Sequence, residues 1–526
     1  MRDFQLPGRS PVFAANGMCA TSHPIASATA VSILEAGGNA VDAAIAAALV
    51  LGIAEPQMTG LGGDCFALIK PAGSDQVVAL NGSGRAPAGL SAETLRSEGY
   101  TTMPLHSGAA VTVPGAVDAF CRMSEDWGRL GLDRILQPAI RYAEEGIPVA
   151  PRVAFDWKLD HEVLTGAARG FYPFDGAAPL PGQMFRAPGQ AEVLRRIASK
   201  GRAGFYEGEV AEDMIAALRA AGGTHTAADF AATEATPGLP LSGQYWDTEL
   251  LEHPPNGQGA TAILMANILN CFDLASHDAL DPYRAHLEIE ATKLAYDARN
   301  RFLADPDHVS RLDHMLSEET AVSLARLISL DRAMPSPAPL TEAVHRETVY
   351  LAVVDRDLMA VSLIFSIFHS FGAGFASDRF GILFQNRGAG FTLEPGHPNE
   401  AGGGKRPMHT IIPAMLRENG RVSTVFGVMG GPYQATGHVR FLTNLCDFGM
   451  GLQEALDAPR CFVQDGVVQM ERGYPGAVAQ ELRHMGHEGV VPEVPLGGAQ
   501  AIRIDHARGV LEGASDPRKD GCALGC

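Results

Sequence analysis

The segment Thr348-Val-Tyr-Leu-Ala-Val-Val-Asp355 joins a proline-rich stretch to an apolar strand, and it decides how the rest of the sequence is interpreted. Before it, Met334–Leu340 reads Met-Pro-Ser-Pro-Ala-Pro-Leu, which cannot hold a helix and predicts a linker. Val349–Val354 is apolar throughout, as expected of a buried strand. The turn Asp355-Arg-Asp357 and the largely apolar run Ala360–Phe368 follow, so the sequence predicts a buried hairpin.

Thr348 stands at the junction between linker and strand, a position that suits an N-terminal nucleophile. A threonine hydroxyl attacks well only when a base takes its proton, and a free α-amino group with a pKa of roughly 7.7 to 8 can be that base on the same residue. The amine exists only if the Glu347–Thr348 bond is cut. Threonine also favours strands for purely structural reasons. The other motifs in the sequence must therefore decide whether Thr348 is catalytic or structural.

The chain before the linker is predicted to be mainly helical and the chain after it to form sheet. The helix predicted over Val41–Gly52 has almost no polar face and should be packed on all sides. A longer helix is predicted over Pro282–Leu303, with Glu288, Lys293 and Arg299 on a face expected to be solvated. After the linker, a second hairpin is expected from Thr410–Leu416 and Val422–Val428, joined through an Asn-Gly turn.

Composition excludes several classes of function. The 526 residues predict about three domain-sized units or one large intimate fold, and 46% hydrophobic residues can bury a large core. A formal charge of −19 is unfavourable for nucleic acid or anionic membrane surfaces. The first residues lack a secretory apolar run, and we expect a cytoplasmic protein. Eight scattered cysteines match no zinc spacing, and His253, His286 and Glu288 lack convergent spacing, so structural histidines are expected.

A paired glycine in Gly427-Val-Met-Gly-Gly-Pro432 ends a predicted strand and could direct backbone amides at a developing oxyanion. Acyl transfer needs such donors, each worth about 2.7 to 4 kcal/mol. An ordinary glycine turn is the alternative on this motif alone. The stretch Lys405-Arg-Pro-Met-His-Thr410 brings a basic pair, an imidazole and a hydroxyl to the start of another predicted strand.

Taken together and in order, these motifs resemble the γ-glutamyltranspeptidase family. The resemblance runs from about Gly17 to Gly521 and includes further motifs in both halves: Ser22-His-Pro24, Gly37-Gly-Asn-Ala-Val-Asp-Ala-Ala44, Gly60-Leu-Gly-Gly63, Val113-Pro-Gly115, Phe371-Gly-Ala-Gly374, Gly381-Ile-Leu-Phe-Gln-Asn386 and Ala514-Ser-Asp-Pro-Arg518. It implies an α+β fold, the four-layer αββα sandwich of N-terminal nucleophile hydrolases. It also implies a proenzyme cut into residues 1–347 and 348–526, two subunits that stay together.

By this resemblance, Thr348 is the nucleophile, Ser366 is a hydroxyl that supports it, and Gly430 with Gly431 forms the oxyanion hole. No metal or organic cofactor is implied. The expected partners are a small-molecule amide substrate and the second subunit of the same precursor, with a dimer of such pairs as an alternative.

The sequence departs from the family at the pocket for a γ-glutamyl group. Ser83 falls where the family has an arginine for the substrate α-carboxylate, and Arg85 is displaced from that place by two positions. The two aspartates that help to hold the substrate ammonium are replaced by Ala389 and Gly390. Phe368 stands where the family has an asparagine, and His409 and Thr410 stand where it has a pair of serines. Without a carboxylate partner the ammonium loses roughly 1.5 to 3 kcal/mol, so γ-glutamyl substrates should bind poorly.

These departures resemble the branch of the family that contains oxamate amidohydrolase and cephalosporin-acylase-like members. Arg85, Arg387 and His409 are predicted to bind a carboxylate beside the scissile amide. A small acidic amide is therefore the expected substrate, with oxamate as the leading candidate and glutathione as the alternative. A relative that is never cleaved and only binds ligands is the competing interpretation from another class.

Overall fold

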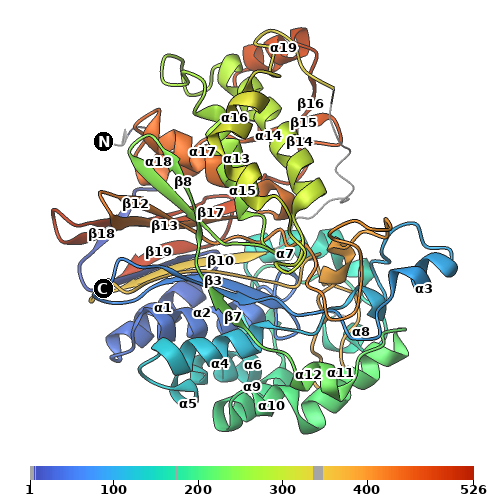
Figure 1. The fold of residues 1–526 in the computed structure, drawn as a ribbon. Helices are drawn as coiled ribbons and strands as arrows, with labels where there is room; N and C mark the ends of the chain where they lie inside the picture. Colours follow the sequence, from blue (N-terminus) through green and yellow to red (C-terminus); the bar gives the residue numbers. More distant parts are fainter. Residues whose placement is uncertain (1–4, 6–7, 173, 175, 336–347) are drawn as a thin grey trace.

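The computed structural model describes residues 5, 8–172, 174, 176–335 and 348–526. Two seven-stranded antiparallel sheets pack face to face, and helices cover the outer face of each (Figure 1). The αββα sandwich expected from the sequence is confirmed. Glu347 and most of the predicted linker, residues 336–340, lie outside the described residues.

One layer, called here the β10 sheet, contains the strand that follows Thr348. Its central hairpin, β10–β11, was predicted from the apolar runs on either side of Asp355-Arg-Asp357 and is confirmed, with Val349 opposite Phe365. All residues of both strands are buried, because one face packs on helices and the other on the second sheet. Its strands, in spatial order, are β19 (Cys522–Gly525), β2 (Gly17–Thr21), β10 (Val349–Asp355), β11 (Ala360–Ser366), β3 (Asp64–Lys70), β4 (Val78–Gly82) and β7 (Thr236–Gly238).

The second layer, the β13 sheet, contains the other predicted hairpin. Its turn places Asn419 and Gly420 at φ 51° and 76°, the left-handed conformations that an Asn-Gly hairpin turn requires. The strand predicted from Thr410 begins only at Ala414. The spatial order is β1 (Val12–Ala14), β18 (Val510–Ser515), β17 (Gly498–Asp505), β13 (Arg421–Met429), β12 (Ala414–Glu418), β9 (Thr248–Glu252) and β8 (Leu241–Tyr245).

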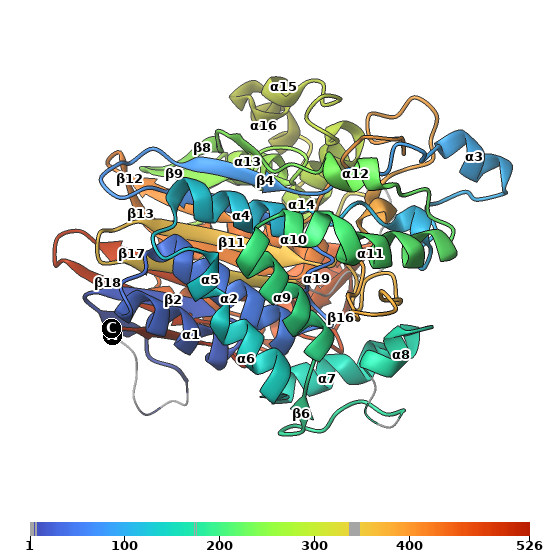
Figure 2. The same ribbon diagram turned by 90° about the horizontal axis from the view of Figure 1, so that it is seen from below.

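Helices from the first half of the chain cover the β10 sheet, as Figure 2 shows from below. The helix predicted over Val41–Gly52 is α2, and each of its residues is buried. Asn39 caps it and forms a capping box with Asp42, which fixes where it begins. The helices of this layer include α1 (Pro24–Glu35), α2 (Ala40–Ala54), α4 (Ala116–Trp127), α5 (Leu132–Ile135), α6 (Gln137–Glu145) and α9 (Pro188–Lys200).

Helices around α14 (Pro282–Phe302) cover the β13 sheet. The expectation that its charged face is solvated is wrong, because Glu288, Lys293 and Arg299 are buried. Glu288 pairs with Arg284 and Arg440, and Lys293 pairs with Glu290, so the charges are compensated inside the protein. The other helices of this layer are α13 (Gly259–Leu269), α15 (Leu312–Leu316), α16 (Glu318–Ala325), α17 (Gln434–Cys446) and α18 (Leu452–Asp457).

Further helices and strands complete the described part of the chain. None of the helices in the described part of the chain has both the length and the apolar character needed to cross a membrane. The remaining elements are α3 (Ala92–Ser97), α7 (Pro151–Asp160), α8 (Ala168–Phe171), α10 (Ala203–Tyr206), α11 (Gly208–Ala220), α12 (Ala227–Ala231), α19 (Gly476–His484), β5 (Ile147–Pro148), β6 (Met184–Phe185), β14 (Cys461–Gln464), β15 (Val467–Met470), β16 (Glu488–Val490), and the 3₁₀ turns Gly108–Ala110, His161–Val163, Arg387–Gly390 and Gly431–Tyr433.

Candidate active site

Thr348 immediately precedes β10 in the centre of its sheet, and only 1% of it is exposed. Its hydroxyl donates to Ser366 Oγ at 3.3 Å. Ser366 is the last residue of β11, and its Oγ also accepts the backbone N–H of Phe368 at 2.9 Å. The two hydroxyls that the sequence singled out are therefore neighbours, because the β10–β11 register brings the start of one strand beside the end of the other.

The loop before β3 packs closely against the end of β11, where Ser366 lies. A Cβ on Gly63 would lie 2.4 Å from the carbonyl oxygen of Ser366, so only glycine lets the loop before β3 approach the end of β11. The glycine loop at Gly60–Gly63 thus serves as a packing surface for the strand that carries Ser366. It is not a dinucleotide-binding turn.

The glycine pair predicted as an oxyanion hole follows β13, which packs against β10 across the two sheets. Gly430 and Gly431 have φ values of 119° and 56°, which residues with a Cβ rarely adopt. Gln258 Nε2 donates to the backbone carbonyl oxygens of Gly431 at 3.3 Å and Thr410 at 2.6 Å. The buried Arg299 side chain donates to Gln258 Oε1 at 3.0 Å. Gln258 was not singled out from the sequence, and Arg299 was expected on a solvated helix face.

Three of the predicted substrate-binding residues contact one another. The Arg387 guanidinium lies 3.6 Å from the centroid of the Phe368 ring, and its Nη1 donates to Thr410 Oγ1 at 3.3 Å. Phe368 follows Ser366 by two residues and adopts φ 79°. Arg387 is buried, so its charge acts in a medium of low polarity. Stacked guanidinium groups of this kind bind carboxylates with two parallel hydrogen bonds, which makes Arg387 the better of the two predicted arginines for that purpose.

His409, predicted to bind a substrate carboxylate, contacts protein groups through both ring nitrogens. Its Nε2 lies 3.3 Å from Asp64 Oδ2, and its Nδ1 accepts the backbone N–H of Ile411 at 3.3 Å. Both ring nitrogens are thus engaged within the protein, which leaves none to contact a substrate carboxylate. Burial first, and then the nearby Arg387 charge, holds the pKa of His409 well below its usual value, so the ring is neutral and Nε2 carries the proton.

Asp64, the partner of His409, is a site residue that sequence reasoning missed. It is fully buried at the start of β3 and lies opposite Ser366 in the strand register. Burial raises the pKa of Asp64 to about 6, against the lowering effects of its hydrogen bonds and of Arg387. The signal available in the sequence was a single carboxylate at the junction between the glycine loop and the apolar strand.

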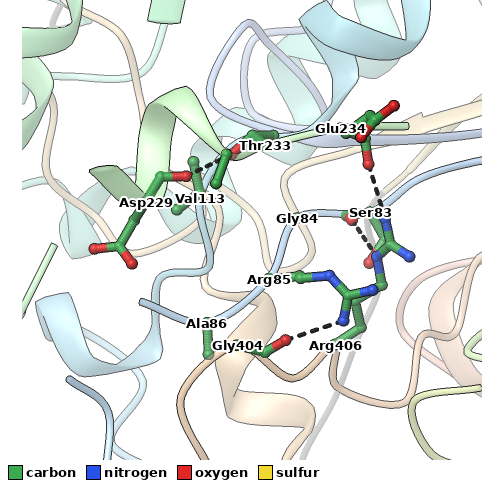
Figure 3. Close-up of a pocket in the computed structure, with 11 residues that line it drawn as sticks. Ser83, Gly84, Arg85, Ala86, Val113, Asp229, Thr233, Glu234, Gly404 and Arg406 are labelled. Carbon is green, nitrogen blue, oxygen red and sulfur yellow. Dashed lines mark hydrogen bonds between the residues drawn. The ribbon is translucent and has the colours of Figure 1, made fainter. Parts of the chain in front are cut away.

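Arg85 lies in a different place from Arg387. Its Nη1 donates to Asp305 Oδ2 at 3.1 Å and to the Gly404 carbonyl at 3.0 Å, and 42% of its side chain is exposed. It lines a cavity of about 100 Å³ together with Arg406, Ser83 and Thr233 (Figure 3). Thr348 and Ser366 do not line this cavity. The structure therefore separates Arg85 from the other predicted carboxylate ligand.

One cluster of the described residues has the side-chain types of a metal site: His286, Glu290 and His487. His286 Nε2 contacts the Ser329 carbonyl at 2.7 Å, so its Nδ1, 2.8 Å from His487 Nε2, accepts that proton. Glu290 pairs with Lys293 at 2.7 Å. Hydrogen bonds and an ammonium group thus engage these atoms within the protein.

Comparisons with known proteins find relatives that match nearly the whole chain. A family model described as Gamma-glutamyltranspeptidase matches residues 26–526. The chain is 35% identical to the glutathione hydrolase-like YwrD proenzyme of Bacillus subtilis (strain 168) and 36% identical to the oxamate amidohydrolase proenzyme of Klebsiella pneumoniae; each match covers 97% of this chain and 98% of the relative. The crystal structure of cephalosporin acylase from Bacillus halodurans has a TM-score of 0.93 at 38% identity, and covers 100% of this chain and 99% of its own.

Proposed function

Because the chain belongs to the gamma-glutamyltranspeptidase family of amidohydrolases, we propose that it cuts itself before Thr348 and then hydrolyses the amide bond of a small acidic substrate through an acyl-enzyme on that residue. The observation that carries the proposal is the contact between the hydroxyls of Thr348 and Ser366, 3.3 Å apart at the start of β10. Residues 1–347 and 348–526 would be the two subunits.

The chemistry follows from the new N-terminus. The α-amine of Thr348 takes the hydroxyl proton, and Oγ1 attacks the substrate carbonyl carbon while Ser366 supports the hydroxyl. The negative charge on the carbonyl oxygen is held by backbone amides at Gly430 and Gly431. The C–N bond breaks, the amine leaves with a proton, and water then adds to the ester to release the acid and free Thr348.

The walls of the site favour an anionic substrate. Arg387 provides a buried cation stacked on Phe368, and Thr410 adds a hydroxyl beside it. Ala389 and Gly390, which stand where the family has aspartates, offer no carboxylate to a substrate ammonium. A small amide with a carboxylate next to the scissile carbonyl, such as oxamate, fits this charge pattern, and a relative named for that activity is 36% identical.

A γ-glutamyl amide is the second candidate, because another relative is named as glutathione hydrolase-like. The two substrates differ in that a γ-glutamyl group carries an ammonium as well as a carboxylate, and Ala389 and Gly390 offer that ammonium no carboxylate partner. The competing non-catalytic interpretation, assembly into a dimer of subunit pairs and a cytoplasmic location remain predictions.

The test is to assay the purified protein with oxamate, following ammonia release, and with a γ-glutamyl anilide, following the free aniline. Thr348→Ala is the control for contaminating activity. We expect turnover of oxamate well above that of the anilide. Fast release from the anilide with none from oxamate would refute the substrate assignment while leaving the nucleophile in place; no turnover of either would favour the non-catalytic interpretation.

A further inference from the structure

Asp64 brings four separate segments of the chain together on the strand next to Ser366, the neighbour of Thr348. Its Oδ1 accepts the backbone N–H groups of Gly84 at 2.9 Å and Gly115 at 3.2 Å, and the side-chain amide of Gln385 at 2.9 Å. Its Oδ2 accepts Nε2–H of His409 at 3.3 Å. Because Asp64 lies opposite Ser366 in the β3–β11 register, the strand that ends at Ser366 is fixed relative to all four segments.

Two of these segments carry the predicted substrate wall. Gln385 precedes Arg387 by two residues, and His409 immediately precedes Thr410, which accepts a hydrogen bond from Arg387. Contacts to Asp64 on both sides therefore hold the Arg387–Thr410 pair in one orientation. The same amide nitrogen of Gln385 also donates a hydrogen bond to Thr112 Oγ1 at 3.0 Å, which further fixes this side chain.

All four donors to Asp64 are uncharged: two backbone amides, a carboxamide and a neutral imidazole. An acceptor that faces only donors suits an ionised carboxylate, which has no proton to place. The charge of Asp64 is therefore not neutralised by its hydrogen bonds, and the nearby cation that lowers its pKa is Arg387. Buried charges of this kind interact strongly because little water screens them.

We propose that Asp64 is a positioning residue that orients the Arg387–Thr410 wall and offsets the charge of Arg387, and so sets how strongly the site prefers an anionic amide. This inference rests on the proposed function, in which Arg387 receives the substrate carboxylate. It assigns a substrate-selecting role to a residue that would not itself touch the substrate.

The test removes the charge of Asp64 and measures binding and turnover separately. Asp64→Asn keeps the shape but replaces one acceptor oxygen by a donor, which must face one of four existing donors. We expect oxalate, an unreactive dianion, to bind at least fivefold more tightly by calorimetry, because Arg387 is no longer offset. The kcat for oxamate should fall at least tenfold, because a wall that still binds the carboxylate but is no longer oriented by Asp64 holds the scissile carbonyl out of line with Thr348.

Matched variants separate this role from a loss of fold. Asp118 is also a largely buried aspartate that accepts a backbone N–H, at Ala235, and pairs with Arg202 outside the site, so Asp118→Asn should leave oxalate affinity unchanged. In an Arg387→Met background, Asp64→Asn should no longer alter oxalate affinity. Asp64→Asn/Gln385→Glu returns a carboxylate to the same network, and its oxalate affinity should return to within twofold of the wild type even if the single variant does not fold.

Oxalate affinity that is the same in wild type and Asp64→Asn, or that changes equally with and without Arg387, would overturn the proposal. Equal losses of kcat/KM for oxamate and for its uncharged analogue oxamide would overturn it as well. A wild type that binds oxalate but does not turn over oxamate would refute the proposed function alone, since the binding comparison needs no catalysis.

Discussion

The surroundings of Arg387 and of Arg85 show why two arginines predicted to bind the same carboxylate are not equivalent. Arg387 is buried, stacks on Phe368 and donates a hydrogen bond to Thr410. Arg85 is 42% exposed, is already paired with Asp305, and lines a small separate cavity. An exposed guanidinium that loses its partner costs little free energy, because water replaces the partner. A buried guanidinium that loses its partner costs much more, because its charge is left unsolvated. Environment, not residue type, assigns the role.

The largest expected effect comes from Thr348→Ala, which removes the hydroxyl that we propose as the nucleophile. This variant should stay a single chain on a denaturing gel and show no hydrolysis, because both self-cleavage and acyl transfer need the hydroxyl. Thr348→Ser keeps the hydroxyl and is the control, expected to cleave more slowly. A Thr348→Ala protein that divides at this position would show that another group cuts the chain.

Arg387→Met tests the buried arginine directly. Losing a charge-assisted hydrogen bond to the substrate carboxylate costs about 1.5–3 kcal/mol, so kcat/KM for oxamate should fall by about 10- to 150-fold, mainly through KM. Steady-state kinetics on oxamate measures the change, and oxamide, which lacks the carboxylate, should be affected much less. An unchanged KM for oxamate would remove Arg387 from the binding site.

Ser366→Ala should have an intermediate effect. The hydroxyl that supports Thr348 makes a neutral hydrogen bond with a net value of about 0.5–1.5 kcal/mol, so kcat should fall about two- to tenfold while the chain still matures. Ser366→Thr retains a hydroxyl and should stay closer to the wild type. A loss as large as that of Thr348→Ala would mean that Ser366 takes part in proton transfer.

The smallest effect is expected from Arg85→Met, the same substitution as that at Arg387 but made in the exposed cavity. Partly exposed ion pairs contribute about 0–1 kcal/mol, so urea unfolding should shift only slightly. The value of kcat/KM for oxamate should change less than threefold. If Arg85→Met matched Arg387→Met in its effect on KM, the distinction between the two regions would fail.

The elements that could be predicted from the sequence are those with uniformly apolar surroundings. The β10–β11 hairpin and α2 are apolar on all sides and are buried on all sides, so local pattern and final environment agree. Sequence reasoning failed where charges are buried in pairs: Glu288 of α14 meets Arg440 from α17, 152 residues away in sequence. Helical periodicity alone cannot distinguish such a face from a solvated one.

The same limit applies to the candidate site. Thr348, Ser366, Phe368 and Arg387 lie close together in sequence and were found from their motifs, and their roles remain predictions. Asp64 and Gln258 come from other segments and act through hydrogen bonds that only the assembled sandwich creates. His409 was found from its motif, but its contact with Asp64, 345 residues away in sequence, was not.

The central claim is that Thr348 becomes the first residue of a separate chain before it acts. Intact-mass spectrometry with N-terminal sequencing of catalytically active protein tests this most directly. We predict two polypeptides, the smaller of which begins with Thr348. Full activity from a single unbroken chain of 55.5 kDa would contradict it.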